Sequence, residues 1–156
     1  RDSWASRGLG DVYKRQVMQW CKSMEAYDKD YSLIYHVPNE GNRNRKTGSN
    51  LVKAGLKKGV PDICVAVPKM GMHGLYIELK KDKQSKVSKE QIEWIKKLSH
   101  QKYIATVCYG ADEAINLIAS YMSSDYEKFL KAHRYLQEDG TTGKVDFKMV
   151  SEIDTE

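Results

Sequence analysis

No stretch of this 156-residue sequence approaches the roughly eighteen consecutive apolar residues that a membrane-spanning helix needs. The pattern of a secretory signal peptide is missing as well. Cysteine is scarce: Cys21, Cys64 and Cys108 are far apart, odd in number, and form no CxxC or Cys/His cluster, which argues against a structural zinc site. Internal repeats and low-complexity segments are also missing. These absences predict a reduced, cytoplasmic protein that does not contact a membrane.

The chain has the length of one domain, and its 40% of hydrophobic residues can form a real core. The formal net charge is +5 and the pI is near 9.0. Residues 1–122 hold 21 Lys and Arg against 13 Asp and Glu, which gives +8, whereas residues 123–156 hold 5 against 8, which gives −3. A basic surface suits a polyanion such as nucleic acid. Ordinary solubilising lysines would give the same totals, so charge alone leaves both interpretations open.

Residues 1–16, which end in GLGDVYKRQ, have the character of a translated sequencing adapter, and a segment of that origin says nothing about the native fold. A genuine mobile leader is the alternative. We therefore expect three parts: an adapter-derived or disordered leader over residues 1–16, a folded domain over residues 17–122, and a C-terminal helix with a loose acidic tail over residues 123–156.

Hydrophobic periodicity and turn residues predict an α/β protein in the order α-β-α-β-β-α-β-α, with a mixed β-sheet flanked by helices. Helices are expected at residues 17–27, 49–56, 88–98 and 111–122, because apolar residues recur there at helical spacing and helix-capping or helix-terminating residues flank several of these segments. Strands are expected at residues 33–37, 63–67, 75–80 and 103–109. Residues 126–136 are expected to form one more helix, followed by a loose tail from residue 138.

Strands 63–67 and 75–80 are predicted to form a hairpin centred near Gly71, with paired residue numbers that sum to about 142. Because side chains alternate between faces, the odd-numbered positions of both strands then form one wholly apolar face. The even-numbered positions bring Asp62, Glu78 and Lys80 together on the other face.

Two converging carboxylates favour a hard divalent cation such as Mg²⁺, which prefers oxygen ligands. Lys80, two residues after Glu78, could orient or activate an attacking water and offset negative charge on a phosphate. Phosphodiester hydrolysis needs these elements. A salt-bridged hairpin with Asp62 as a turn residue is the plain structural alternative.

Several motifs occur in the same order as in a known family. They are HVPNEG from residue 36 with Arg43, GVPD from residue 59, GLYIELK from residue 74, Ser88 and Gln91, Trp94, Tyr103, and VCYG from residue 107 with the pair Glu113-Ala114. Over residues 16–122 the sequence thereby resembles the VRR-NUC (virus-type replication-repair nuclease) family of the PD-(D/E)xK superfamily. The resemblance implies a restriction-endonuclease-like fold and a DNA endonuclease that uses Mg²⁺ or Mn²⁺.

The resemblance also implies site residues. Asp62 and Glu78 would be metal ligands together with the Leu79 carbonyl, Lys80 would be the catalytic lysine, and Gln91 would line the site. Gln91 is alternatively the N3 partner of a Ser88 capping box, and the two roles are compatible. Family members usually carry an acidic residue in the first helix, slightly ahead of the position of Gln16. Val12 and Tyr13 stand in that region here, which predicts a weak nuclease unless Asp11 or Glu40 supplies the acid.

Basic residues flank the expected metal site and are the predicted phosphate contacts. They are Arg43, Arg45, Lys46, Lys53, Lys57, Lys81 and Lys83. The stand-alone size resembles that of phage members of the family, which act as homodimers on branched DNA. We therefore expect a homodimer with branched or double-stranded DNA as its partner. Its expected location is the bacterial host cytoplasm if the gene is phage-encoded. Two alternatives stay open: a DNA-binding module with little or no activity, and a nuclease-like subunit of a repair complex.

Overall fold

The computed structural model describes residues 4–38 and 45–144, and none of the helices in these ranges is long and apolar enough to cross a membrane. Helix α1 (Trp4–Met24) and the 3-10 turn η1 (Lys29–Leu33) come first along the chain. The remaining elements are β1 (Ile34–His36), α2 (Arg45–Lys53), β2 (Ile63–Val65), β3 (Leu75–Lys80), α3 (Lys89–His100), β4 (Ile104–Tyr109), α4 (Ala111–Met122), α5 (Tyr126–Ala132), β5 (Arg134–Leu136) and β6 (Thr142–Lys144).

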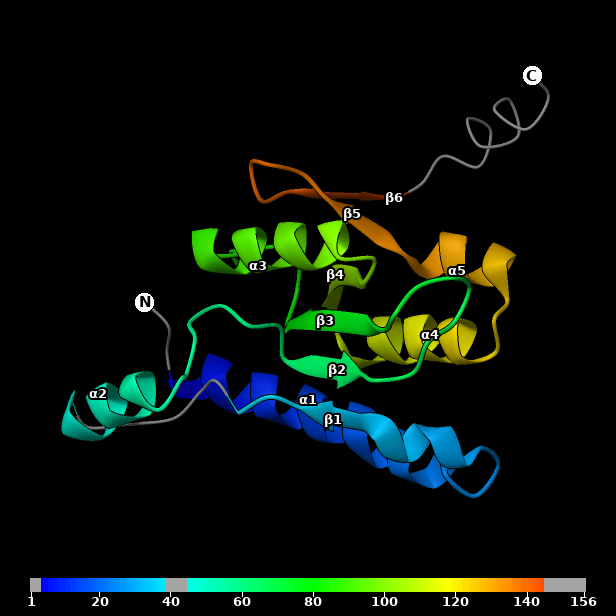
Figure 1. Cartoon of the computed structure of the whole chain (residues 1–156), viewed down its shortest axis with the longest axis horizontal. Coiled ribbons are helices and arrows are strands. Elements are labelled where there is room, and N and C mark those ends of the chain that lie inside the picture. Colours follow the sequence, from blue (N-terminus) through cyan, green and yellow to red (C-terminus); the bar gives the residue numbers. More distant parts are fainter. Residues whose placement is uncertain (1–3, 39–44, 145–156) are drawn as a thin grey trace.

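The main sheet has the order β1-β2-β3-β4. Its first two pairings are antiparallel and the β3–β4 pairing is parallel. Helices α1 and α4 cover one face of this sheet and α3 covers the other (Figure 1). The predicted α/β class and the order α-β-α-β-β-α-β-α are therefore confirmed, with a restriction-endonuclease-like mixed sheet between helices.

The odd-numbered residues of the central hairpin form the predicted apolar face. Ile63, Val65, Leu75 and Ile77 are fully buried and belong to the main core, which α1 and α4 complete. A second, smaller cluster on the other face joins Ile95 of α3 to the sheet. Burial of both faces explains why these strands are rich in Val and Ile.

The expected register of this hairpin was wrong by two residues. The pairs Ile63↔Ile77 and Val65↔Leu75 have numbers that sum to 140 instead of 142. The chain reverses at Met70 and Gly71, which both have positive φ, and the bridge Lys69↔Met72 leaves one more residue on the β2 side than on the β3 side. An offset of two keeps every side chain on its predicted face, because side chains alternate with a period of two.

Two predicted helices start or stop elsewhere. Helix α1 begins at Trp4 instead of Val17: Tyr13, one turn before Val17, packs against the same core and extends the apolar stripe. Helix α2 starts at Arg45 and ends at Lys53, whereas residues 49–56 were expected. Gly55 has φ +105° and ends α2, because glycine adopts this conformation at low cost.

The C-terminal region also differs from expectation. Helix α5 ends at Ala132, and residues 134–144, expected as helix and loose tail, contain the antiparallel hairpin β5–β6. The hydroxyl of Thr106 on β4 donates to the Arg134 carbonyl at 2.5 Å. The Arg134 side chain forms an ion pair with Glu113. These contacts hold β5 beside β4, so tertiary interactions replace the helical conformation that the local pattern favoured.

Candidate active site at the end of the sheet

The loop before β2 is fixed on helix α3 and thereby positions Asp62. The indole Nε1 of Trp94 donates to the Lys58 carbonyl at 3.0 Å. Gly59 has φ +89°, and a β-carbon at this position would lie 2.6 Å from the carbonyl carbon of Glu90. Only glycine fits such a close approach at positive φ. The sequence Gly-Val-Pro-Asp therefore brings the chain against the start of α3 and then turns Asp62 into the sheet.

Asp62 is buried, with 3% of its surface exposed. Its Oδ2 accepts a hydrogen bond from the Leu79 amide at 2.9 Å, and its carbonyl accepts from the Val37 amide at 2.6 Å. When the β2–β3 register is continued by one residue, Asp62 lies across from Glu78. Neighbouring strands bring directly paired side chains within about 5.5 Å at the β-carbons.

Glu78 is 2% exposed and is held by Gln91 from the first turn of α3. The Gln91 Nε2 donates to Glu78 Oε1 at 2.8 Å. The Oε1 of the same Gln91 accepts from Lys80 Nζ at 3.0 Å and from the Ser88 amide at 2.9 Å. Gln91 therefore closes the capping box of α3 and also links the two charged residues of β3. The two roles considered for Gln91 are compatible in geometry.

Two lysines balance the two buried carboxylates. Lys80 Nζ lies 3.6 Å from Glu78 Oε1, and Lys14 Nζ, from α1, lies 3.6 Å from Asp62 Oδ1. Both lysine side chains are largely buried, at 16% and 13% exposure. Burial weakens solvent screening, so these interactions are stronger than surface ion pairs. The cluster therefore pairs two acidic with two basic side chains.

The donor set fits a divalent cation of the Mg²⁺ type. Two buried carboxylates face one another at the end of two strands, and proteins commonly bind Mg²⁺ through one or two carboxylates, with waters and substrate phosphates as the other ligands. Within residues 4–38 and 45–144 there is no group of three or more His, Cys, Asp and Glu that could hold a metal ion.

The cysteines do not offer an alternative nucleophile. All three are buried and free. Burial raises the pKa of Cys21 to about 12 and also raises the pKa of Cys108. Both thiols therefore stay protonated and unreactive near neutral pH.

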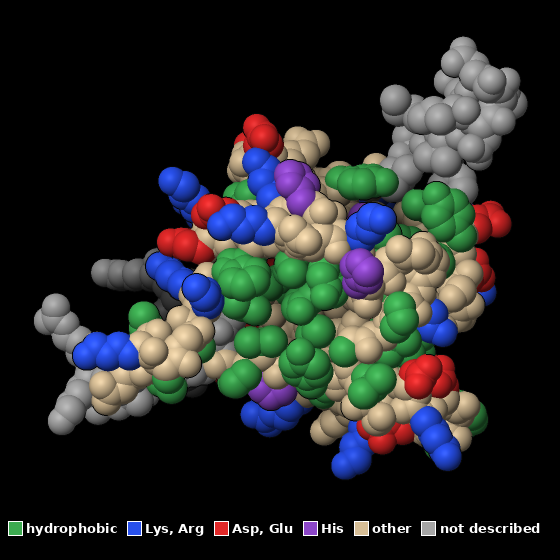
Figure 2. Space-filling view, viewed as in Figure 1, with side chains coloured by type: hydrophobic (Ala, Val, Ile, Leu, Met, Phe, Trp, Pro, Cys, Tyr) green, Lys and Arg blue, Asp and Glu red, His purple; other side chains and the backbone are tan. Residues whose placement is uncertain are grey.

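The predicted DNA contacts lie partly within the described residues. Lys53, Lys57, Lys81 and Lys83 are exposed. Figure 1 places α2 and the start of α3 at the same end of the sheet, and Figure 2 shows Lys and Arg side chains over both regions. Two expected residues, Glu40 and Arg43, lie outside the described residues, as do the side chains of Arg45 and Lys46.

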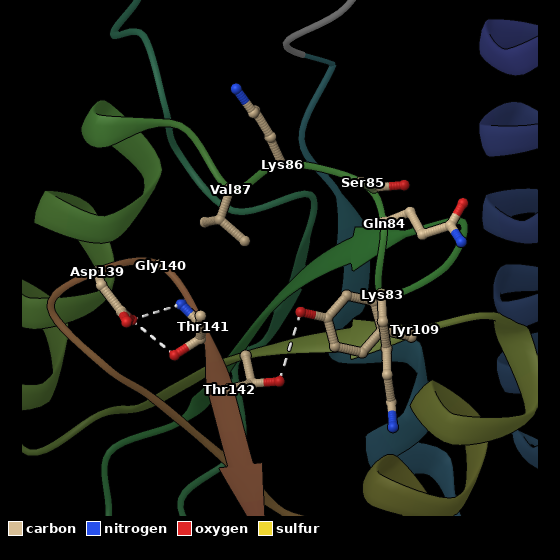
Figure 3. Close-up of a pocket in the computed structure, with 10 residues that line it drawn as sticks. All are labelled: Lys83, Gln84, Ser85, Lys86, Val87, Tyr109, Asp139, Gly140, Thr141 and Thr142. Carbon is tan, nitrogen blue, oxygen red and sulfur yellow. Dashed lines mark hydrogen bonds between the residues drawn. The ribbon is translucent and has the colours of Figure 1, made fainter.

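A groove lies between the loop that follows Lys80 and the C-terminal hairpin (Figure 3). One wall is the loop that follows Lys80, including Lys83 and Lys86, and the other is the β5–β6 turn with Thr141. Tyr109 forms part of the lining, and its hydroxyl accepts from Thr142 Oγ1 at 3.4 Å. The groove therefore offers cationic and hydroxyl groups beside the end of the strand that carries Lys80.

Sequence reasoning missed Lys14 and the hairpin wall. Lys14 lies in the adapter-like stretch, for which no structural element is predicted. Its spacing of three residues before Val17 could have placed it on the inner face of the helix. The β5–β6 hairpin had only a weak signal, the turn around Gly140 between two short segments.

Comparison with known proteins gives a consistent result. The family model of the VRR-NUC domain matches residues 14–112, which is more than half of the chain. A solved structure described as a VRR_NUC domain protein superposes with a TM-score of 0.63 at 30% sequence identity, and the match covers 74% of this chain and 88% of that one. A search of curated proteins found no significant match.

Proposed function

The chain belongs to the VRR-NUC family of nucleases, and we propose that it is a divalent-metal-dependent DNA endonuclease whose centre is formed by Asp62, Glu78 and Lys80. The observation that carries this proposal is the joint burial of the two carboxylates at one end of the sheet, with the Lys80 ammonium 3.6 Å from Glu78. Burial of four charged groups costs free energy. Such an arrangement is typical of a functional site.

In this proposal Asp62, Glu78 and the Leu79 carbonyl would hold Mg²⁺ or Mn²⁺. A bound ion of this kind supplies Lewis acidity to the phosphate and lowers the pKa of water. The oxygen of a water molecule attacks phosphorus and the water gives up a proton to solvent. The bond from phosphorus to the leaving sugar oxygen breaks, and that oxygen takes up a proton from solvent to form a hydroxyl group.

Lys80 donates a hydrogen bond to the attacking water or to a non-bridging phosphate oxygen and offsets the charge that develops there. Gln91 keeps Lys80 and Glu78 in place through its amide group. Gln91 is thus a positioning residue in this scheme.

Binding of DNA would rest on the exposed lysines around the site. Lys53 and Lys57 belong to α2 and the turn after it, and Lys81 and Lys83 follow Lys80 on the other side. Phosphate contacts from such dispersed residues position a nucleic acid without reading its sequence. The proposed substrate is therefore double-stranded or branched DNA, bound without strong sequence preference.

A homodimer that cuts branched DNA is the finer form of this proposal. The edge strand β1 supports it, because its outer side has no neighbouring strand among the described residues. Tyr35 on β1 is 50% exposed, and Leu33, the last residue of η1, is 49% exposed. Figure 2 shows hydrophobic side chains gathered over the middle of the face in view. Exposed edges and apolar patches are common interaction surfaces.

A second candidate function is a DNA-binding module with little catalytic activity. The ion pair of Lys14 with Asp62 favours it, since a lysine stands beside one of the two carboxylates that would hold the metal ion. Both candidates predict DNA binding, and only the first predicts cleavage.

A cleavage panel tests the proposal. The full chain is incubated with linear, nicked, flapped and four-way DNA in Mg²⁺, in Mn²⁺ and in EDTA, next to the double variant Asp62→Asn, Glu78→Gln. We expect cleavage that EDTA and the double variant both abolish. DNA binding without any cleavage would support the second function, and cleavage that persists in the double variant would refute the site.

A further inference from the structure

Lys14 is bound to the proposed centre although it lies on a different element from Glu78 and Lys80. Helix α1 packs on the core through Tyr13 and Val17, and Lys14, three residues before Val17, is carried on the side that faces the sheet. Its Nζ lies 3.6 Å from Asp62 Oδ1, and only 13% of its side chain is exposed. Lysines in the surface ion pairs of this chain are much more exposed: the side chain of Lys97 beside Glu93 is 74% exposed, and that of Lys131 beside Glu127 is 62% exposed.

The carboxylate of Asp62 has its two oxygens engaged in different ways. Oδ2 accepts from the Leu79 amide, which fixes the orientation of the group. Oδ1 lies next to the Lys14 ammonium. A metal ion that binds Asp62 must therefore approach an oxygen that already has a cation beside it. Two cations that share one carboxylate repel each other, and the repulsion is strong where water is largely excluded.

We propose that Lys14 is an internal counterion of Asp62 that competes with the divalent metal ion and sets a low metal affinity for this chain. The inference rests on the proposed function, because it assigns the metal ion to Asp62 and Glu78. Without Lys14, Lys80 would be the remaining lysine of the cluster, and it could balance the negative charge of only one of the two buried carboxylates. Binding of a divalent cation would then relieve this repulsion instead of adding to the positive charge of the cluster.

The position of Lys14 also bears on the acidic residue that the family resemblance implies for the first helix. Val12 and Tyr13 stand in the region where that residue is expected. Val12 is 42% exposed, Tyr13 packs against the core, and position 14 is the one that meets Asp62. Neighbouring helix positions point about 100° apart, so only one of the three can face the carboxylate. A cation at position 14 thus acts directly on Asp62.

Direct titration of Mn²⁺ tests the inference without using cleavage. The electron paramagnetic resonance signal of free Mn²⁺ is measured in wild type, Lys14→Gln, Lys14→Arg and Asp62→Asn. Lys22→Gln serves as the matched control, since Lys22 is exposed on the same helix. We expect Lys14→Gln to bind Mn²⁺ on the order of tenfold more tightly, within the range for coupled neighbouring groups. Lys14→Arg and Lys22→Gln should keep the affinity of wild type.

The outcomes separate this inference from the proposed function. Equal or weaker Mn²⁺ binding by Lys14→Gln, together with a loss of binding in Asp62→Asn, would overturn the competition and leave the metal site in place. Unchanged binding in Asp62→Asn would place the metal ion elsewhere and overturn both. Thermal unfolding with and without Mn²⁺ provides a second readout, because a ligand of the folded state raises the melting temperature. The rise should be larger in Lys14→Gln than in wild type, and an equal or smaller rise would count against the competition.

Discussion

Gln91 donates a hydrogen bond of 2.8 Å to Glu78, although the two residues lie on different elements. The same side chain caps α3 through Ser88 and accepts from Lys80. The start of the helix and the orientation of two charged side chains therefore depend on a single amide. Loss of this amide should affect both stability and chemistry.

The variant Gln91→Ala is expected to lower cleavage by about 10–100-fold, the usual effect of removing a group that orients a metal ligand. It should also destabilise the fold by about 1 kcal/mol through the lost cap. Ser88→Ala is the control, because it removes the hydroxyl cap and leaves Gln91 beside Glu78. Both variants should lose similar stability in denaturant unfolding. An equal loss of cleavage rate in both would show that Gln91 acts only through the helix.

Asp62→Asn and Glu78→Gln, made singly, should each reduce the cleavage rate by more than about 100-fold. Loss of a residue that only orients a metal ligand costs up to about 100-fold, and loss of a ligand itself should cost more. Each change keeps the shape of the side chain and removes the charge that would bind the cation. Gel-shift affinity for DNA should stay near that of wild type in Ca²⁺, since dispersed lysines carry the binding. A variant that cuts at the rate of wild type would remove its residue from the proposed centre.

Gly59→Ala is expected to disturb the position of Asp62. The new β-carbon would meet the backbone of Glu90 at 2.6 Å, so the loop must shift. A displacement of 1 Å at a catalytic group can cost on the order of 100-fold in rate. The matched control is Gly55→Ala, since Gly55 also has positive φ but open space around it. The control should lose only about 1–2 kcal/mol of stability for the left-handed conformation.

Stability and rate are measured for both glycine variants. Normal cleavage by Gly59→Ala would mean that contact of this loop with α3 does not position Asp62.

DNA binding should depend strongly on salt, with a slope of about −0.9 per neutralised phosphate. The double change Lys53→Gln, Lys57→Gln should reduce the magnitude of that slope by roughly 2. The control is Lys128→Gln, Lys131→Gln on α5, where each lysine already has an acidic partner. Fluorescence anisotropy over a salt series measures both slopes. Equal slopes in the two double variants would place the DNA away from α2.

Acid should destabilise the fold partly through His133, which stacks on Phe129 and also contacts Tyr135. Burial lowers the pKa of His133 to about 4, below the ordinary value of about 6.5. As the pH falls, His133 therefore becomes protonated near pH 6.5 in the unfolded chain but only near pH 4 in the folded chain. Stability is accordingly lost as the pH falls through this window, by at most about 1.4 kcal/mol per pH unit for this group.

The melting temperature of wild type should fall more steeply between about pH 6.5 and about pH 4 than that of His133→Gln. Parallel slopes would show that His133 does not contribute to the acid sensitivity.

The sequence alone determined the local features of this protein. The alternation of Ile63, Val65, Ile77 and Leu79 along two strands predicted the buried face, because the alternation of side chains along a strand does not depend on which strand pairs with it. The same alternation placed Glu78 and Lys80 on the opposite face, and an error of two residues in the register did not change this. The Ser88 capping box was equally local, since its groups are only three residues apart.

Tertiary structure decided what comes from distant parts of the chain. Local periodicity predicted a first helix that begins at Val17, whereas the helix begins at Trp4, packs on the core through Tyr13 and carries Lys14 to Asp62. Residues 134–144 have little strand signal of their own and become a hairpin because Thr106 and Glu113 hold Arg134. The charge balance around Asp62 therefore could not be predicted from sequence, because its cationic partner lies forty-eight positions away on a helix (62 − 14).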